Sequence, residues 1–166
     1  MTNLSAATRT AATAFTILIG IGGPATAAIS RSGPPANGHE RSCARQFASA
    51  VDAYVETTAT RDAAGFNALL SDDVTIVLAN GGVLYGKDQS AAFIDDFFAD
   101  PGWTQTFTEL TRHVEACRTG FVLFDSVYSV PAQNRVSPLV IGVTFTYTHG
   151  RWLVLHNQDS NGPASS

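Results

Sequence analysis

The C-terminal third of the chain carries the clearest pattern of apolar and polar positions. Two runs rich in apolar and β-branched residues, Pro138–Thr148 and Arg151–Ser160, flank the dipeptide His149-Gly150. Val, Ile, Phe, Tyr and Thr dominate the first run, and these residue types are typical of a half-buried strand. We therefore predict two long strands joined by a tight turn, lying at the centre of a curved sheet.

Further runs of the same kind predict the rest of the sheet. Asn80-Gly81 lies between two of these runs and favours a hairpin with a type I′ turn, in which both central residues need positive φ. Thr119-Gly120 is typical of another tight turn, and Pro131–Pro138 is expected to be a looser connection. The predicted strands are Val74–Leu78, Val83–Tyr85, Thr104–Cys117, Phe121–Val130, Leu139–Thr148 and Trp152–Asp159.

Apolar residues recur at steps of three and four in the first half of the chain, which predicts helices. The first helix spans Ser42–Arg61, and a shorter one follows, with Asp62 as its N-cap. A third helix covers Ser90–Ala99 and is stopped by Asp100-Pro101-Gly102. Because helices come first and a mostly antiparallel sheet comes last, the predicted fold class is α+β, with the sheet packed on three helices.

The N-terminal segment reads as a secretory signal peptide over residues 1–27. Arg9 precedes an apolar run, Ala11–Ile21, and Ala25-Thr26-Ala27 supplies the small side chains of a cleavage site. A retained membrane anchor or a disordered tail is the alternative. We expect a flexible linker at 28–40, one domain at 41–160 and a short tail at 161–166, in a secreted or periplasmic protein without a membrane anchor after cleavage.

Composition and charge exclude some functions and restrict others. Ten basic residues against fourteen acidic ones, without a basic run, argue against a nucleic-acid partner. The four histidines show no zinc spacing, and neither a Gly-rich phosphate loop nor a GxSxG motif is present, so we expect no metal and no cofactor. Cys43 and Cys117 form an even pair in an exported chain, which favours one disulfide over two buried thiols.

Several stretches together resemble the nuclear-transport-factor-2-like superfamily, in particular its SnoaL-like branch and its branch similar to the calcium/calmodulin-dependent kinase II association domain. The stretches are ATRDAAGFNALLSDDVTIV, NGGVLYGKDQSAAFIDDFF, DPGW and GRWLVLHNQDS. The resemblance implies a cone-shaped curved sheet over helices, a deep pocket, and dimerisation through the sheet. It also implies Trp152, His156 and Ser160 as family positions, whereas Gln158 stands where some relatives have a second histidine.

Strand alternation predicts which side chains of the last strand share a face. Trp152, Val154, His156 and Gln158 alternate with Leu153, Leu155, Asn157 and Asp159. The resemblance implies that the first set faces the pocket, where His156 is a candidate general acid or base and Gln158 a ligand-binding residue. A hydrogen-bonded structural histidine is the alternative.

Four other residues are candidates for the pocket. Asp125 interrupts an apolar run, so it lies either on the solvent face or in an apolar pocket, where a raised pKa would suit it to proton transfer. Tyr54 and Tyr128 are candidate ligand contacts, although Tyr54 also fits a core aromatic residue. We expect Trp103 near the mouth of the pocket, with packing at a chain reversal as the alternative.

Two functional hypotheses follow. The first is an exported protein that binds a small, mainly apolar molecule and carries out cofactor-independent acid–base chemistry of the isomerase, cyclase or hydrolase type. The second is a non-catalytic association module that forms a homodimer through its sheet, because both faces of the strand over residues 140–147 are rich in β-branched and aromatic residues.

Export is testable directly. The mature chain should begin near Ala28, because Ala25 and Ala27 supply the side chains that a signal peptidase recognises. N-terminal sequencing of protein recovered from the medium or periplasm checks this expectation. Exported material that still begins with Met1 would contradict it.

Overall fold

The structure is a computed structural model that describes residues 38–162. The predicted signal peptide, residues 28–37 of the predicted linker and residues 163–166 of the predicted tail lie outside the described residues. The linker expectation is wrong at its end, because residues 38–40 already belong to the first helix. Asn161 likewise belongs to the last strand and not to a tail.

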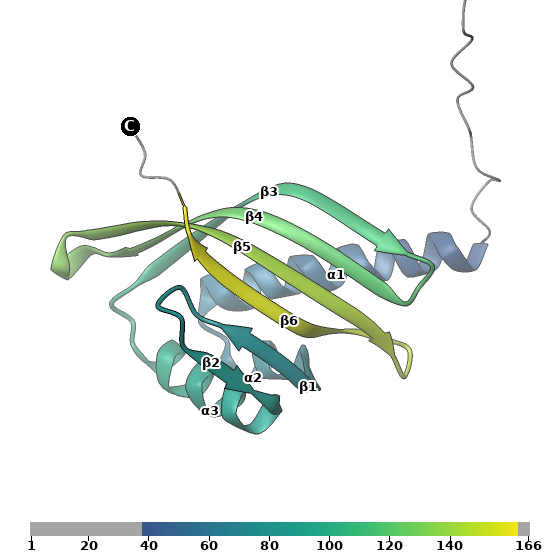
Figure 1. The fold of residues 1–166 in the computed structure, drawn as a ribbon, viewed down its shortest axis with the longest axis horizontal. Helices are drawn as coiled ribbons and strands as arrows, with labels where there is room; N and C mark the ends of the chain where they lie inside the picture. The colour runs from purple at the N-terminus through teal and green to yellow at the C-terminus, as the bar shows by residue number, and fades with distance from the viewer. Residues whose placement is uncertain (1–37, 163–166) are drawn as a thin grey trace, which may run out of the picture. The chain divides into compact units, whose positions relative to one another are not determined.

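The described part of the chain is α+β, as predicted, with three α-helices and a six-stranded sheet (Figure 1). The strand order across the sheet is β2-β1-β6-β5-β4-β3. The helices are α1 (Gly38–Thr60), α2 (Ala63–Ala68) and α3 (Gly86–Ala99), and a 3₁₀ turn covers Pro131–Gln133. The strands are β1 (Leu70–Val77), β2 (Val83–Tyr85), β3 (Thr104–Glu115), β4 (Thr119–Val130), β5 (Arg135–Thr148) and β6 (Arg151–Asn161).

The sheet is antiparallel except at one junction. β1 runs parallel to β6, and all other neighbouring strands are antiparallel. This arrangement places the helical N-terminal half beside the last strand of the chain, so α1, α2 and β6 meet around one interior. None of the helices in residues 38–162 is long and apolar enough to cross a bilayer.

Two connections differ from prediction. β5 begins at Arg135, because Asn134 adopts a left-handed conformation with φ of 48° and turns the chain back at once. The predicted loose connection up to Pro138 is therefore wrong, and Pro138 pairs with Val127 in the ladder. The hairpin at Asn80-Gly81 is present, but only Gly81 has positive φ there, so the predicted type I′ turn is wrong.

Two other tight turns contain neighbouring residues with positive φ. His149 and Gly150, with φ of 50° and 78°, join β5 to β6 at the predicted position. The turn between β3 and β4 is centred on Ala116 and Cys117, with φ of 45° and 52°, and not on the predicted Thr119-Gly120. Gly120 instead lies within β4.

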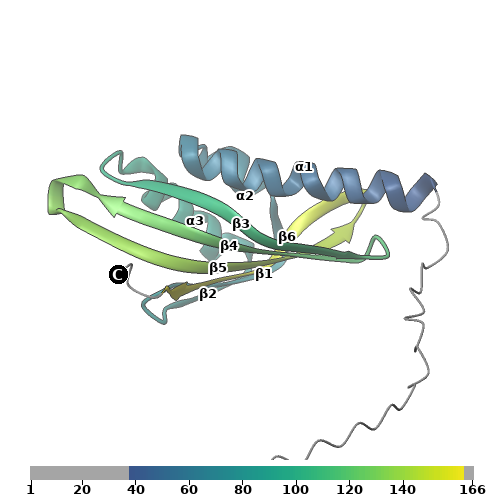
Figure 2. The same cartoon turned by 90° about the horizontal axis from the view of Figure 1, so that it is seen from above.

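Gly120 allows α1 to approach the sheet closely. A Cβ atom at this position would lie 2.4 Å from the Phe47 ring, closer than any real contact. The Phe47 ring is 1% exposed and packs against Phe145 and Trp152, with ring centroids 5.4 and 5.0 Å away. Figure 2 shows α1 lying along one side of the sheet. The core therefore lies between α1 and the faces of β4, β5 and β6 that it covers.

A disulfide joins the N-terminal part of α1 to the turn between β3 and β4. Cys43 and Cys117 are separated by 74 residues, and their Cα atoms lie 5.6 Å apart. The pairing that the cysteine count favours is thus present in the structure.

Loss of this bridge should destabilise the protein. Closing a loop of 74 residues reduces the entropy of the unfolded chain, which corresponds to about 4 kcal/mol. Urea unfolding of the Cys43→Ser, Cys117→Ser double variant measures the loss. The control is a reductant, which should lower the stability of the wild type and leave the double variant unchanged. Equal stability of the two proteins without reductant would contradict the expectation.

Candidate functional site

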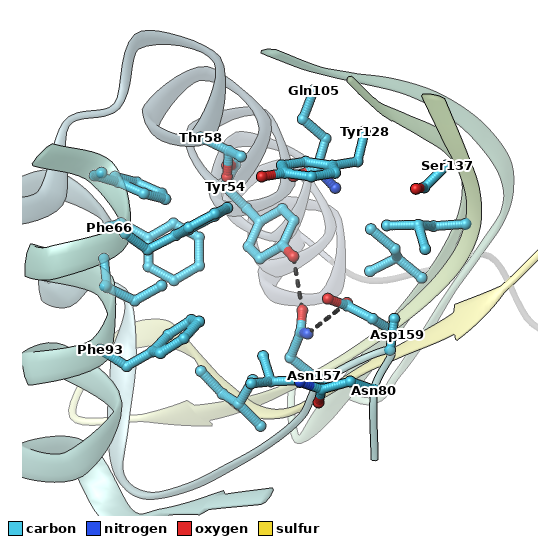
Figure 3. Close-up of a pocket in the computed structure, with 18 of the residues that line it drawn as sticks. Tyr54, Thr58, Phe66, Asn80, Phe93, Gln105, Tyr128, Ser137, Asn157 and Asp159 are labelled. Carbon is cyan, nitrogen blue, oxygen red and sulfur yellow. Dashed lines mark hydrogen bonds between the residues drawn. The ribbon is translucent and has the colours of Figure 1, made fainter. Parts of the chain in front are cut away.

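A cavity of about 530 Å³ opens between the helices and the sheet (Figure 3). Its volume lies in the range of small-molecule sites. Aromatic side chains of α2 and α3 form one wall, and aliphatic side chains of the sheet form the other. The apolar lining residues are Phe66, Ile76, Leu78, Ala79, Phe93, Ile94, Phe97, Phe98, Leu139 and Ile141.

Three polar side chains form a hydrogen-bonded chain along one wall of this cavity. The Tyr54 hydroxyl, on α1, donates to Asn157 Oδ1 at 2.6 Å. Asn157 Nδ2, on β6, donates to Asp159 Oδ1 at 2.9 Å (Figure 3). Tyr54 and Asn157 are 4% and 5% exposed, so the chain is anchored in the core and ends at the carboxyl group.

The environment changes the titration of both ends of this chain. Burial raises the pKa of Asp159 to about 6, and the hydrogen bond from Asn157 offsets part of that rise. Burial, and then the charge of Asp159, raise the pKa of the Tyr54 hydroxyl well above its ordinary value. Near neutral pH, Tyr54 is therefore a fixed proton donor, whereas Asp159 exchanges its proton readily.

A β-bulge at Leu155 decides which side chains of β6 face the cavity. Phe145 pairs with Val154 and Thr144 pairs with His156, so Leu155 is an extra residue without a partner on β5. Trp152 and Val154 point into the core before the bulge, with exposures of 4% and 0%. After the bulge, Asn157 and Asp159 take the inward positions.

The predicted positions of His156 and Gln158 in the cavity are therefore wrong. Both residues lie on the opposite face of the sheet, where His156 pairs with Thr144 and Gln158 with Gly142. The inserted Leu155 reverses the inward and outward faces of β6, and the apolar pattern of Trp152 and Val154 gives no sign of this insertion.

The other predicted site residues divide into two groups. Tyr54 and Tyr128 line the cavity, as expected, and the Tyr54 hydroxyl lies in its interior, where it donates to Asn157. Asp125 is exposed on the outer face of β4, which is the solvent position that the sequence left open. The predicted position of Trp103 at the mouth is wrong. Trp103 is 1% exposed, and its ring stacks on that of Phe97 at 4.4 Å.

Asn157, Asp159 and Arg135 are cavity residues that the sequence pattern does not predict. Alternation predicts the outward face of the last strand for Asn157 and Asp159, and only recognition of the bulge reveals their inward position. Arg135 lines the cavity as well, but it lay in the stretch interpreted as an irregular connection. In residues 38–162 no three His, Cys, Asp or Glu side chains are grouped closely enough to hold a metal ion.

Comparison with protein families gave one match. A family model for the SnoaL-like domain matches residues 51–155, which is more than half of the chain. A search among curated proteins gave no match.

Solved structures with the same fold are numerous and distant in sequence. A proposed calcium/calmodulin-dependent protein kinase type II association domain from Thiobacillus denitrificans is 14% identical, with a TM-score of 0.61 over 70% of this chain and 94% of that one. A proposed dehydratase of the NTF2-like family from Streptomyces avermitilis is 17% identical, with a TM-score of 0.62 over 75% and 99%. An NTF2-like protein with a cystatin-like fold from Novosphingobium aromaticivorans is 18% identical, with a TM-score of 0.61 over 76% and 86%. At these identities the likeness concerns the fold alone.

The raised pKa of Asp159 leads to a prediction about stability. The pKa is about 6 in the folded chain and 3.8 for an ordinary aspartate, so the folded state binds this proton more tightly. The contribution to stability is fully present below pH 3.8 and is lost as the pH rises through about 6, with a total of roughly 3 kcal/mol. Asp159→Asn should therefore become more stable relative to the wild type over this interval.

Urea unfolding between about pH 4 and pH 8 measures this difference. Asp125→Asn is the matched control, because it removes an exposed carboxylate from the other face and should show a much smaller pH dependence. A stability difference between Asp159→Asn and the wild type that stays constant with pH would contradict the assignment.

Proposed function

Because the chain belongs to the SnoaL-like domain family, we propose that it binds a small, mainly apolar molecule in its cavity and moves a proton on that molecule without a cofactor. One observation carries the proposal: Asp159, whose pKa is about 6, lines an otherwise largely apolar cavity. A carboxylate that titrates near neutral pH in such surroundings is suited to act as a general base.

The hydrogen-bonded chain supports this role by fixing the carboxyl group. Asn157 occupies Oδ1 of Asp159, and within residues 38–162 the other oxygen, Oδ2, accepts no side-chain or backbone hydrogen bond. Oδ2 is thus the oxygen that can take a proton from a bound molecule. Tyr54 holds the amide of Asn157 from the other side, so the direction of the carboxyl group is set before any ligand enters.

The reaction class follows from this single base. Asp159 removes a proton from a carbon next to a carbonyl group, and the electron pair of the broken C–H bond moves into an enolate. Return of the proton from Asp159 to another carbon gives an isomerisation. Transfer of that proton to a hydroxyl group on the neighbouring carbon, with cleavage of the C–O bond, releases water and gives an elimination. The structural likeness to a proposed dehydratase supports the second outcome.

The disulfide also bears on the cellular compartment in which the protein acts. Disulfides such as Cys43–Cys117 persist mainly in oxidising surroundings, so the bridge supports an exported protein. This agrees with the expected signal peptide, and both features support a proposed activity outside the cytoplasm.

Hydrogen–deuterium exchange tests the base without knowledge of the substrate. A panel of apolar ketones in D₂O should show faster loss of α-protons by NMR with the wild type than without protein. The rate should rise as the pH passes about 6, the pKa of Asp159. Asp159→Asn should lose the acceleration while Asp125→Asn retains it. Acceleration that survives in Asp159→Asn would contradict the role of this carboxyl group.

A second candidate function rests on the outer face of the sheet. This face is not covered by helices and carries Phe121, Leu123, Val127, Val140 and Leu153 between threonines, with few charged residues. Val127 is 37% exposed, and the others are partly exposed. We propose that a second copy of the chain covers this face, as in an association module. The likeness to a proposed association domain supports this arrangement.

Light scattering at micromolar concentration should then give twice the monomer mass. Leu123→Glu places a charge in the middle of the outer face and should yield a monomer that remains folded. Ala64→Glu, on exposed α2, is the control and should leave the dimer intact. A wild type that is monomeric under these conditions would exclude the association module and leave the cavity proposal standing.

A further inference from the structure

The inward-facing residues of β5 show where the cavity opens. Arg135, Ser137, Leu139 and Ile141 are alternate residues of this strand, and all four line the cavity. Arg135 is exposed and Ser137 is partly buried, whereas Leu139 and Ile141 are 6% and 1% exposed. The exposure falls steadily along the strand, so the mouth lies at Arg135 and the closed end lies beyond Ile141.

The register of β5 and β6 places Asp159 toward the closed end. Asp159 is the direct partner of Ile141, which lies six residues from Arg135 along β5. At the rise of a strand, six residues span about 20 Å. The cavity therefore carries a cationic side chain at its mouth and a titratable carboxyl group in its interior, with an apolar stretch between them.

Arg135 is held at the mouth without a carboxylate partner. Its guanidinium carbon lies 5.2 Å from the centroid of the Tyr128 ring, within the distance of a cation–π contact, and Tyr128 also lines the cavity. The only ion pair within residues 38–162 joins Arg112 to Glu109. Among the residues that the structure describes, no other Lys, Arg or His lines the cavity. A guanidinium group in this setting offers planar, paired N–H donors that fit a carboxylate.

We propose that the ligand is an amphipathic anion, whose carboxylate head pairs with Arg135 at the mouth while its apolar body extends along β5 toward Asp159. This inference rests on the proposed function of the cavity and adds the chemical class and orientation of the ligand. The opposite orientation is disfavoured, because it would bring two carboxylates together in an apolar interior. Arg135 is a specificity-determining residue in this arrangement, and it places the distal end of the ligand beside the base.

Decanoate and decan-1-ol are suitable probes, because they share an apolar chain and differ in the charge of the head. Trp103 reports binding by fluorescence, since its ring lies 4.4 Å from Phe97 and 5.9 Å from Tyr128, two residues of the cavity wall. At pH 7.5 the wild type should bind decanoate about tenfold more tightly than decan-1-ol, as expected for a charge-assisted hydrogen bond.

Arg135→Gln should lose that preference and bind decan-1-ol within twofold of the wild type. Arg151→Gln is the matched control, because Arg151 is exposed and does not line the cavity, and it should keep the preference. Added salt gives a second readout on the unaltered protein, since it should weaken decanoate binding and leave decan-1-ol binding unchanged.

The possible failures are distinguishable. Equal affinity of the wild type for both probes, or a preference for decanoate that survives in Arg135→Gln, would overturn the role of Arg135 and leave the proposed function intact. Absence of binding by both probes would contradict the apolar binding cavity itself, and with it the proposed function.

Discussion

The single inserted residue at Leu155 is the constraint on which the site depends. Trp152 and Val154 fix the first half of β6 in the core, so the strand cannot rotate to choose its inward residues. Val154 is further held by a hydrogen bond of 2.7 Å from its N–H to the carbonyl oxygen of Leu69. The neighbouring β1 is irregular at the same level, between Leu70 and Thr75. Both strands beside the bulge accommodate it, and Asn157 and Asp159 consequently face the interior.

Placing a carboxyl group there opposes folding, and the surroundings offset this cost. Desolvation is the larger effect on Asp159, and the hydrogen bond from Asn157 is the smaller opposing one. The aromatic cluster around the cavity supplies the compensating packing, in which Tyr54 stacks parallel to Phe124 and lies close to Phe66. The carboxyl group thus lowers the stability of an otherwise well-packed core.

Periodicity predicted the type and order of the helices and strands because each buries one face. Periodicity does not predict the ends of these elements where glycine or asparagine changes the direction of the chain. α3 begins at Gly86, with φ of 74°, and not at Ser90, because only the backbone of glycine makes this start inexpensive. The position of Arg135 is not predictable for a similar reason, since the two prolines favour a loop over 131–138, whereas Asn134 already closes the turn.

The site was predictable only where a side chain belongs to an uninterrupted element. Tyr54 lies on the apolar stripe of α1, and Tyr128 lies on the inward face of β4, so alternation and helical spacing place both correctly. Asn157 and Asp159 follow a bulge, which changes the face without changing the composition of the strand. The position of Trp103 is not predictable from the sequence, because a chain reversal can bury an aromatic side chain as readily as expose it. In the structure the Trp103 ring is buried by stacking on Phe97.

The disulfide and the cavity share one helix, and this couples them. Cys43, Phe47, Val51 and Tyr54 form a single stripe on α1, in which Tyr54 lies eleven residues, or about three turns, after the bridged cysteine. The bridge therefore restricts the rotation of α1 about its axis, and the same rotation directs the Tyr54 hydroxyl at Asn157. A ligand that requires the Tyr54 hydroxyl to face Asn157 would therefore bind the bridged chain more tightly than the reduced one. By thermodynamic reciprocity, that ligand would make the disulfide harder to reduce.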